Sequence, residues 1–413
     1  MKTWLRVREN TRTTGVLACV LFVLCVSVYL PGATRDGVQA NDTRGAAVAA
    51  YLFVETGSLA FPQSWPQEHA FWATERADGR LSVNRMPGVI LTGIPAYAVA
   101  RLAGVTPRLD TVTHPVFVPF APAAYAALTV TAAALALLFL VFVRLVGNKD
   151  AFVAAAVIAF TTPFFSVAAD ALWPHATTAL ALGLLLIAED KPRLLAASGA
   201  ALAVFTRPHL AVVPVVMALL QRKDVRSVAA LGVGVSVGIG ALVWYSVAVF
   251  GTWLPAAGYD TGGFLSRLVS ASPYATAENM VQALLNIDRG ILLHTPYVAV
   301  LFPAIVVAWR DAPAFTKRAA IAGLIYFVLQ MRMARFSGGG GFAQWRTSLE
   351  TLVLFAPLGI YASVHVVRQY RLWRALLWVS VAVAFGMTVW GVIDGGRSEW
   401  AHQWWAQQQQ LHR

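Results

Sequence analysis

Two aspartates follow the first apolar segment of the chain, in the stretch "RDGVQANDTRGAAVAAYLFVETGSLAF". Asp36 and Asp42 both lie close to the end of that segment. A carboxylate can take a proton from a hydroxyl nucleophile when it is ionised and within hydrogen-bond reach, so either residue is a candidate general base. Aspartate is also favoured at the start of a helix. Capping a helix that begins near Asn41 or Asp42 is therefore an equally favoured alternative role for Asp42.

A set of arginines lies at or near the ends of apolar segments. A guanidinium group binds a phosphate through two parallel hydrogen bonds, which suits it to a phosphorylated ligand. For any one arginine, a side chain that reaches out to lipid headgroups is the better interpretation. For the whole set, we expect at least one or two phosphate ligands. The set is Arg85, Arg207, Arg289, Arg332, Arg335 and Arg346.

Four consecutive glycines interrupt the apolar sequence in "MARFSGGGGFAQWR", which runs from Met333 to Arg346. Glycine allows the backbone to approach a ligand closely and to adopt positive φ. Exposed amides in such a stretch form an anion-binding concavity. We therefore predict that Arg346, with backbone groups including those of Gly339 and Gly340, lines a phosphate site. The alternative is a flexible loop that makes no contact with a ligand.

Three further ionisable side chains are candidates for an auxiliary or acceptor-binding role. Glu350 follows Arg346 by one helical turn at the start of an apolar segment, where an ionisable group is a functional candidate. An i,i+4 ion pair with Arg346 is the favoured alternative. His175 and His294 could act as bases or be satisfied structural groups. The sequence has no clustered spacing of metal ligands, so neither a metal site nor another cofactor is predicted.

The composition is that of a polytopic membrane protein. Of 413 residues, 58% are hydrophobic and 13% charged, against roughly 25% charged in soluble proteins. The net charge of +12 does not indicate nucleic-acid binding, because the charges stand in short clusters between apolar segments. Cys19 and Cys25 both lie in the first apolar segment, which reads as an uncleaved anchor.

Charge and hydropathy predict a topology of about 11 membrane crossings. Basic residues before the first segment place the N-terminus in the cytoplasm. Five later clusters also lie inside if the segment near 88–104 is interfacial or re-entrant, and the C-terminus is then outside. Further apolar segments are expected near 120–143, 151–169, 171–188, 194–206, 208–220, 227–250, 291–309, 319–334, 347–366 and 374–393. The clusters are Arg144/Lys149, Lys191/Arg193, Arg222/Lys223/Arg226, Arg310/Lys317/Arg318 and Arg368/Arg371/Arg374.

This topology makes residues 1–413 one all-α transmembrane domain with three external loops. They are 32–87, which carries the candidate acid, 251–290, and the glycine-rich 335–346. In the first loop, "AAVAAYLFVE" is apolar on most faces and too short to span, so we expect one or two helices that lie along the membrane surface. Most polar residues outside the basic clusters then face the far side of the membrane.

Several stretches together resemble the GT-C superfamily of polyprenyl-phosphate-sugar-dependent glycosyltransferases. "NDTRGAAVAAYLFVETGSLAF" is similar to the first external loop of that family, with an acid followed by a helix and a "GS" turn. "VNRMPGVILTGIPAYAVARLAG", "ALWPHATTALALGLLL", "AVFTRPHLAVV", "GYDTGGF" and "RGILLHTPYVAV" follow in the expected order. "RFSGGGGFAQWRTSLETLVLFAP" is similar to a "GGW-F-x-x-R" stretch before a late helix. Many members have adjacent acids in the first loop, whereas Asp36 and Asp42 are separated.

The resemblance implies a GT-C-like helical bundle in the cytoplasmic (plasma) membrane with its active site on the extracytoplasmic face. It implies an inverting transfer from a polyprenyl-phosphate sugar to a glycan, glycolipid or protein of the cell envelope, with Asp42 as general base and Asp36 as the alternative. Mannose and arabinose are the favoured sugars. A lipid or solute transporter is the rival class, although inverted repeats and midplane charges are not evident. A non-catalytic membrane protein of envelope assembly is the second rival.

Overall fold

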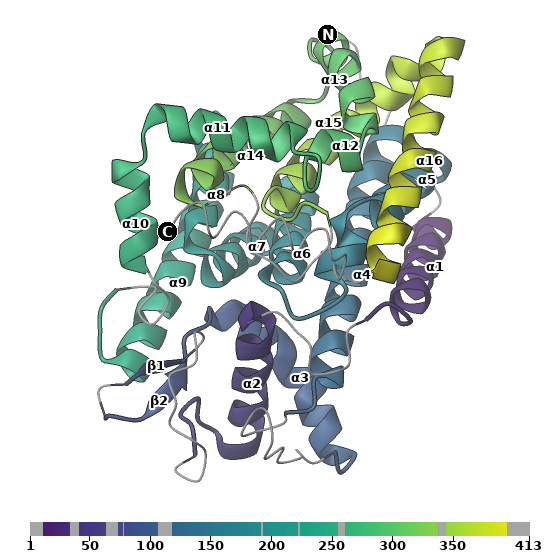
Figure 1. Cartoon of the computed structure of the whole chain (residues 1–413). Helices are drawn as coiled ribbons and strands as arrows, with labels where there is room; N and C mark the ends of the chain where they lie inside the picture. Colours follow the sequence, from purple (N-terminus) through teal and green to yellow (C-terminus); the bar gives the residue numbers. More distant parts are fainter. Residues whose placement is uncertain are drawn as a thin grey trace.

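The structure of the chain is a computed structural model that describes residues 11–33, 41–62, 73–76, 78–105, 118–190, 193–221, 224–254, 261–334, 336 and 344–394. It is a bundle of helices with one small hairpin (Figure 1). The helices of the first half are α1 (Thr11–Tyr29), α2 (Asn41–Thr56), α3 (Pro87–Leu102), α4 (Ala121–Val146), α5 (Asn148–Thr161), α6 (Pro174–Ile187), α7 (Arg193–Thr206) and α8 (Val212–Leu220).

The helices of the second half continue the bundle and add a group of short helices near one end. They are α9 (Val225–Phe250), α10 (Thr261–Ser270), α11 (Pro273–Leu285), α12 (Ile291–His294), α13 (Tyr297–Ala308), α14 (Ala314–Met333), α15 (Leu349–His365) and α16 (Arg371–Asp394). Four short irregular turns are η1 (Phe164–Ala168), η2 (Ala188–Asp190), η3 (Pro208–Ala211) and η4 (Val367–Gln369). Strands β1 (Ala73–Glu75) and β2 (Leu81–Val83) pair antiparallel with Ala73 opposite Val83.

The main core lies around α4 and α6. Helix α4 packs on α1, α5, α6 and α15, while α6 packs on α7 and α7 on α9. The last pair is close because Gly234 of α9 faces α7, where an added Cβ would lie 2.3 Å from the carbonyl oxygen of Ala197. Close approach through small residues is typical of helix pairs in membranes. Helices α1, α5 and α16 form one edge of the bundle (Figure 1).

The first external loop predicted from the sequence contains a second, smaller core. Helix α2 packs along α3 and beside β2, and its alanines let the two helices come close. Ala50 faces Gly93, and the carbonyl of Val54 accepts a hydrogen bond from Arg101 further along α3. The two helices therefore run parallel, and their first turns lie at the same end of the pair. The predicted helix in 43–56 is confirmed as part of α2.

Described residues of the basic clusters lie together at one end of the bundle. Arg144 at the end of α4 donates to the carbonyl of Ile187 at the end of α6 (2.9 Å). Arg318 near the start of α14 pairs with Glu189 after α6, and Arg368 pairs with Asp150 near the start of α5. The contacts join segments that the sequence placed on the cytoplasmic side. The described residues of the predicted basic clusters thus meet as the charge pattern requires.

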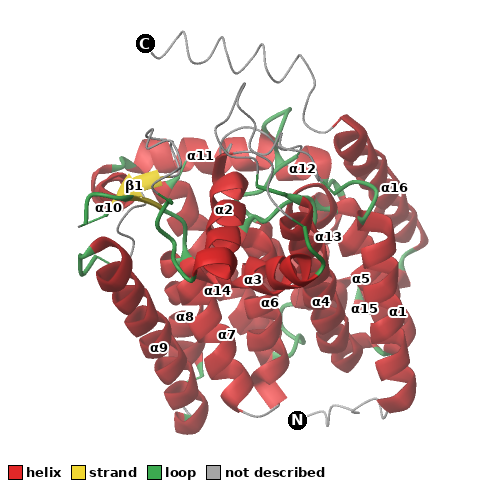
Figure 2. Ribbon diagram, turned by 90° about the horizontal axis from the view of Figure 1, so that it is seen from below, coloured by secondary structure: helices red, strands yellow, loops and turns green. Residues whose placement is uncertain are grey.

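The short helices and the hairpin lie at the other end. Figure 2 shows β1, α10, α11 and α12 at this end, with α9, α7, α4 and α1 running away from it. Helix α11 starts with Ser272 as N-cap, whose hydroxyl accepts from the amide of Ala275, and with Pro273 as first residue. Helix α9 is followed by its C-cap Gly251, which has a left-handed conformation (φ 70°).

Five of the described helices are long and apolar enough to cross a membrane: Thr11–Tyr29, Ala121–Val146, Val225–Phe250, Leu349–Gln369 and Arg371–Ile393. Shorter apolar helices occupy most of the other segments predicted from the sequence. The segment near 88–104 is helix α3, which covers α2 and reaches α4. The predicted total of about 11 crossings and the surface position of the first-loop helices remain predictions.

Candidate functional site

Three segments with ionisable residues meet at the end of the bundle opposite the basic clusters. His175 lies in the first turn of α6, whose last turn contacts Arg144 of the basic end. Arg207 lies between α7 and η3 in an extended conformation, because the following Pro208 cannot continue the α7 hydrogen bonds. Glu350 lies in the first turn of α15, where a negative charge is favoured by the helix dipole.

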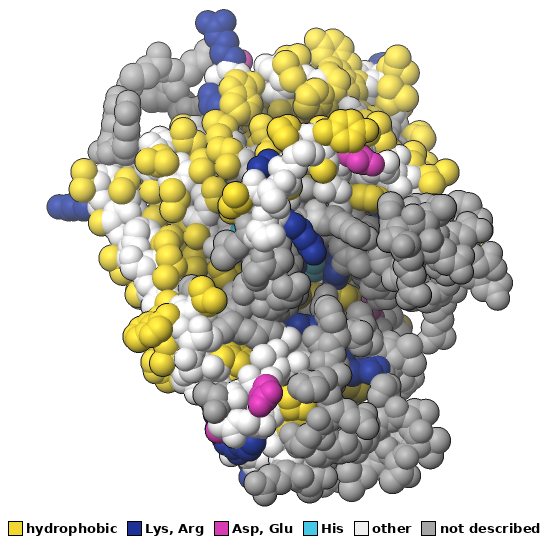
Figure 3. All heavy atoms as spheres, turned by 60° about the vertical axis from the view of Figure 1, so that its left-hand side comes forward, with side chains coloured by type: hydrophobic (Ala, Val, Ile, Leu, Met, Phe, Trp, Pro, Cys, Tyr) yellow, Lys and Arg dark blue, Asp and Glu magenta, His cyan; other side chains and the backbone are white. Residues whose placement is uncertain are grey.

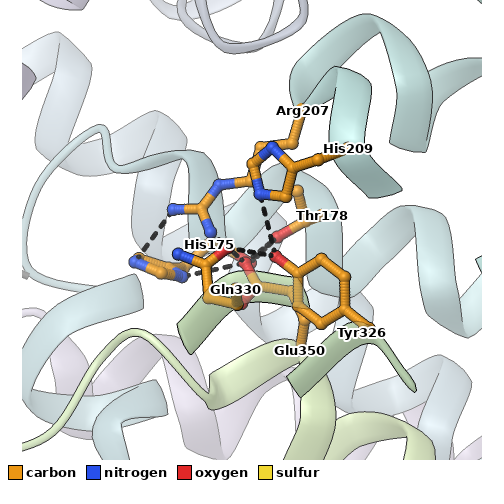
Figure 4. Close-up of polar contacts among 7 residues, drawn as sticks. All are labelled: His175, Thr178, Arg207, His209, Tyr326, Gln330 and Glu350. Atoms are coloured by element: carbon orange, nitrogen blue, oxygen red, sulfur yellow. Dashed lines mark hydrogen bonds and ion pairs between the residues drawn. The ribbon is translucent and has the colours of Figure 1, made fainter. Parts of the chain in front are cut away.

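Glu350 connects these segments through a single carboxylate oxygen (Figure 4). Its Oε1 accepts hydrogen bonds from His175 Nδ1 at 2.9 Å and from Thr178 Oγ1 at 2.8 Å. Arg207 Nη1 forms an ion pair with the same oxygen at 3.2 Å. The side chains of His175 and Glu350 are both buried. A buried carboxylate needs such partners, so the contacts fix α6, α15 and the α7–η3 junction relative to one another.

The contacts of His175 define the tautomer of its ring. Nδ1 faces the carboxylate of Glu350, whereas Nε2 lies 3.3 Å from Nη2 of Arg207. Arginine nitrogens can only donate hydrogen bonds, and a carboxylate can only accept them. The arrangement is satisfied by a neutral imidazole that donates from Nδ1 and accepts at Nε2. His175 therefore serves here as a bridge between Glu350 and Arg207.

A second layer of polar side chains lies beside Arg207. The ring of His209 stacks on Tyr326 of α14 at 5.6 Å between centroids, and the Tyr326 hydroxyl lies 3.3 Å from His209 Nε2. The same hydroxyl donates to Gln330 Oε1 at 3.3 Å. Figure 4 shows these side chains next to the Glu350 contacts. We call the seven residues His175, Thr178, Arg207, His209, Tyr326, Gln330 and Glu350 the Glu350 cluster.

Arg346 lies over the indole ring of Trp173, with its guanidinium carbon 4.2 Å from the ring centroid. Trp173 directly precedes α6 and is buried, so the arginine is held next to the first turn that contains His175. Such stacking fixes the plane of the guanidinium group. The sequence favoured Glu350 as the partner of Arg346, but the arginine that pairs with Glu350 in the structure is Arg207.

Arg85 approaches the same region from the connection between β2 and α3. Its Nη1 donates to Asn84 Oδ1 at 2.8 Å, and its carbonyl accepts from the Tyr245 hydroxyl at 3.1 Å. The first turn of α3 is in close contact with the end of α7. A Cβ added at Gly88 would lie 2.3 Å from Oγ1 of Thr206, the residue before Arg207.

The first turn of α2 therefore also lies near this end of α7, because α2 and α3 are parallel. Asp42 is the second residue of α2, which supports the predicted helix start at Asn41 or Asp42; its side chain lies outside the described atoms. Asp36, Gly339 and Gly340 lie outside the described residues. Their predicted roles remain predictions.

Arg289 and His294 lie in and after the connection between α11 and α12. The backbone amide of Arg289 donates to Asn286 Oδ1 at 3.0 Å, and Gly290 follows directly before α12. Burial lowers the pKa of Arg289 from its ordinary value because it disfavours the charged form, while Asp288 opposes this shift. His294 is buried at the end of α12. These two residues remain candidates for the donor and auxiliary sites.

Lys and Arg side chains are visible in the middle of one face of the molecule, with a histidine among them (Figure 3). Hydrophobic side chains cover much of the upper and left-hand part of the same face. Within the described residues, no group of three or more His, Cys, Asp or Glu side chains is placed to hold a metal ion.

The sequence indicated Arg207, His175 and Glu350 separately but did not indicate the neighbouring side chains Thr178, His209, Tyr326, Gln330 and Trp173. A signal was present in part: Gln330 interrupts the apolar run "IYFVLQM", and polar groups inside membrane segments are expensive. Threonine and tyrosine give no such signal, because both occur widely in helices without a functional role.

Neither a protein-family model nor a curated protein sequence matches the chain. The chain is similar to the solved structure of the Archaeoglobus fulgidus oligosaccharyltransferase in the apo form, with a TM-score of 0.52 and 13% sequence identity. The similarity covers 97% of this chain and 57% of that one, so this chain spans little more than half of the archaeal protein.

At this level of identity the comparison establishes the fold. The chain has a helical membrane-protein fold like that of an oligosaccharyltransferase, in agreement with the GT-C-like fold implied by the sequence resemblance.

Proposed function

We propose that the protein is an inverting glycosyltransferase that transfers a sugar from a polyprenyl-phosphate donor to an envelope glycan, glycolipid or protein. The observation that carries the proposal is the meeting of Arg207 and Arg346 around the first turn of α6, in a bundle with the fold of an oligosaccharyltransferase. Two guanidinium groups near the membrane surface suit the phosphate of a lipid-linked donor.

The orientation of the bundle supports an extracytoplasmic site. The described residues of the basic clusters lie at the end opposite Glu350, as shown by the contacts of Arg144 and Arg318. Basic clusters favour the cytoplasmic side of a plasma membrane. The Glu350 cluster then faces the extracytoplasmic side, where an envelope acceptor and a flipped lipid-linked donor are both accessible.

Arg207 and Arg346 are proposed as the main ligands of the donor phosphate, with Arg85 and Arg289 next to them. Arg207 is held by Glu350 and His175, and Arg346 by the ring of Trp173. Held side chains bind with less loss of conformational entropy than mobile ones. Gly339 and Gly340 are proposed to add backbone amides, and His294 and Glu350 remain proposed auxiliary residues.

Asp42 is proposed as the general base, with Asp36 as the alternative. This role is supported by the position of Asp42 at the start of α2. The parallel packing of α2 on α3 and the close contact of Gly88 with Thr206 bring that helix start near Arg207. The chemistry requires removal of a proton from the acceptor hydroxyl as it attacks the anomeric carbon. The bond from that carbon to the donor phosphate then breaks with inversion, and the released polyprenyl phosphate retains the charge stabilised by the arginines.

The test is incubation of the purified full-length protein with a panel of polyprenyl-phosphate sugars, beginning with mannose and arabinose. Each donor is supplied with envelope glycan, glycolipid and peptide acceptors, and products are identified by mass spectrometry. We expect one donor to be consumed with mass transfer to an acceptor, and the Asp42→Asn variant to lose this activity. Consumption of none of the donors, together with uptake of a lipid or solute into vesicles, would refute the proposal in favour of a transporter.

A further inference from the structure

Gln344 has an unusual backbone conformation directly before Trp345 and Arg346. Among the described non-glycine residues, Gln344 alone has a positive φ (64°), and its side chain is buried. Such a conformation is uncommon for glutamine and persists only when the surroundings hold it. Because Gln344 lies two residues before Arg346, the contacts that fix its conformation also bear on the position of Arg346.

The side-chain amide of Gln344 connects two distant parts of the bundle. Its Oε1 accepts from the hydroxyl of Ser166 at 2.9 Å, and its Nε2 donates to Oγ1 of Thr388 at 2.8 Å. Ser166 lies in the π-helical turn η1, and Thr388 lies in α16. The hydroxyl of Thr388 donates to the carbonyl of Ala384 at 2.9 Å, so its oxygen is available to accept the amide N–H of Gln344. Both ends of the amide therefore have a matching partner.

The next three residues are also fixed by side-chain contacts. Trp345 Nε1 donates to Thr295 Oγ1 at 2.9 Å, and Thr347 Oγ1 donates to the carbonyl of Phe336 at 2.9 Å. Between them, Arg346 stacks on Trp173. The Gln344 side chain is held by η1 and α16, so the backbone turn at this residue sets the direction of the chain from Gln344 to Arg346, which stacks on Trp173. A shift of this turn would move Arg346 away from the ring.

We propose that Gln344 is a positioning residue, whose amide fixes the left-handed turn that places the Arg346 guanidinium over Trp173. The inference deepens the proposed function, because it assigns Gln344 to the placement of a donor-phosphate ligand. The effect of Gln344 on the position of Arg346 can be tested in the protein alone, without measuring glycosyl transfer.

The first experiment measures the reactivity of individual arginines in the purified full-length protein with phenylglyoxal, followed by peptide mass spectrometry. Gln344→Met keeps the length of the side chain and removes both hydrogen bonds. We expect Arg346 to be modified about fivefold faster in this variant, the product of losing two hydrogen bonds that each contribute about twofold to threefold. Arg368, which pairs with Asp150 at the opposite end, is the internal control and should react at an unchanged rate.

Two partner variants keep the test valid if Gln344→Met folds poorly. Ser166→Ala and Thr388→Val each remove one of the two hydrogen bonds and leave Gln344 in place. We expect each to raise the Arg346 rate by a smaller factor, about twofold to threefold. Equal Arg346 rates in the wild type and all three variants would overturn the inference.

The second experiment measures donor KM and kcat in the same variants. We expect Gln344→Met to raise the donor KM about fivefold, with a smaller change in kcat, because a ligand of the bound donor has moved. Unchanged donor KM with faster Arg346 labelling would overturn the link to the donor site. Absence of turnover in the wild type with every donor would instead refute the proposed function, and the labelling result would still decide whether Gln344 positions Arg346.

Discussion

Replacement of Arg207 by alanine should destabilise the protein far more than replacement of Glu350 by glutamine. The carboxylate of Glu350 is 1% exposed, whereas the side chain of Arg207 is 15% exposed. Arg207→Ala leaves a buried carboxylate without its cation, which costs about 3–5 kcal/mol. In Glu350→Gln, the amide oxygen still accepts from His175 and Thr178, and Arg207 regains some solvent. We expect a smaller loss of about 1–3 kcal/mol.

The double variant Arg207→Ala/Glu350→Gln should recover part of the combined loss, because neither charge is then left alone. We expect the loss in the double variant to be about 2 kcal/mol smaller than the sum of the two single losses, and this difference is the coupling free energy of the pair. The assay is unfolding of the full-length protein by SDS in mixed micelles, with the four members of the cycle measured under the same conditions. The ranking of the two single variants by loss of unfolding free energy is as informative as the coupling, because it shows which charge is the more costly to leave buried without its partner.

The matched control is the ion pair between Asp150 and Arg368 at the basic end, whose side chains are 30% and 59% exposed. Its cycle, Asp150→Asn with Arg368→Ala, should give a coupling of about 0–1 kcal/mol, as for exposed pairs. A coupling at Arg207 and Glu350 no larger than this control would contradict the reasoning. So would a larger loss in Glu350→Gln than in Arg207→Ala.

Three further predictions concern the reaction and the packing of the bundle. Asp42→Asn should retain the fold and donor binding while turnover falls by roughly 10²–10⁴-fold; retained turnover here, with loss in Asp36→Asn, would show that the base is Asp36. Arg346→Ala should raise the apparent donor constant more than it lowers expression, and Arg346→Lys should restore binding only in part because lysine cannot form the paired contact; unchanged donor affinity in both would place the phosphate elsewhere. Gly234→Ala should destabilise the packing of α9 on α7, since the new Cβ would lie 2.3 Å from the carbonyl oxygen of Ala197. At Gly232 on the same helix, an added Cβ would meet no heavy atom within 4 Å, so Gly232→Ala should stabilise the protein by up to about 1 kcal/mol. Equal SDS unfolding of the two glycine variants would contradict the packing argument.

The elements of the bundle could be predicted from the sequence because their signals are local. Runs of apolar residues predict α4 and α9 within a few residues of their ends, and the basic clusters predict which ends meet. Pro174 and Pro208 mark the starts of α6 and η3, since proline fits the first turn of a helix. The position of His175, Arg207 and Glu350 at the end opposite the basic clusters was also expected from charge and hydropathy alone.

The partners within the site were decided by the tertiary structure. The sequence placed Glu350 one turn from Arg346 and favoured an ion pair between them. In the structure, Glu350 pairs with Arg207 from the α7–η3 junction, whereas Arg346 stacks on Trp173. Local spacing shows only which side chains can meet within one helix. Which helices face each other depends on close packing, as at Gly88 against Thr206, and on the need of a buried carboxylate for several donors at once. These are properties of the packed bundle, because they arise only when segments far apart in the chain share one interior.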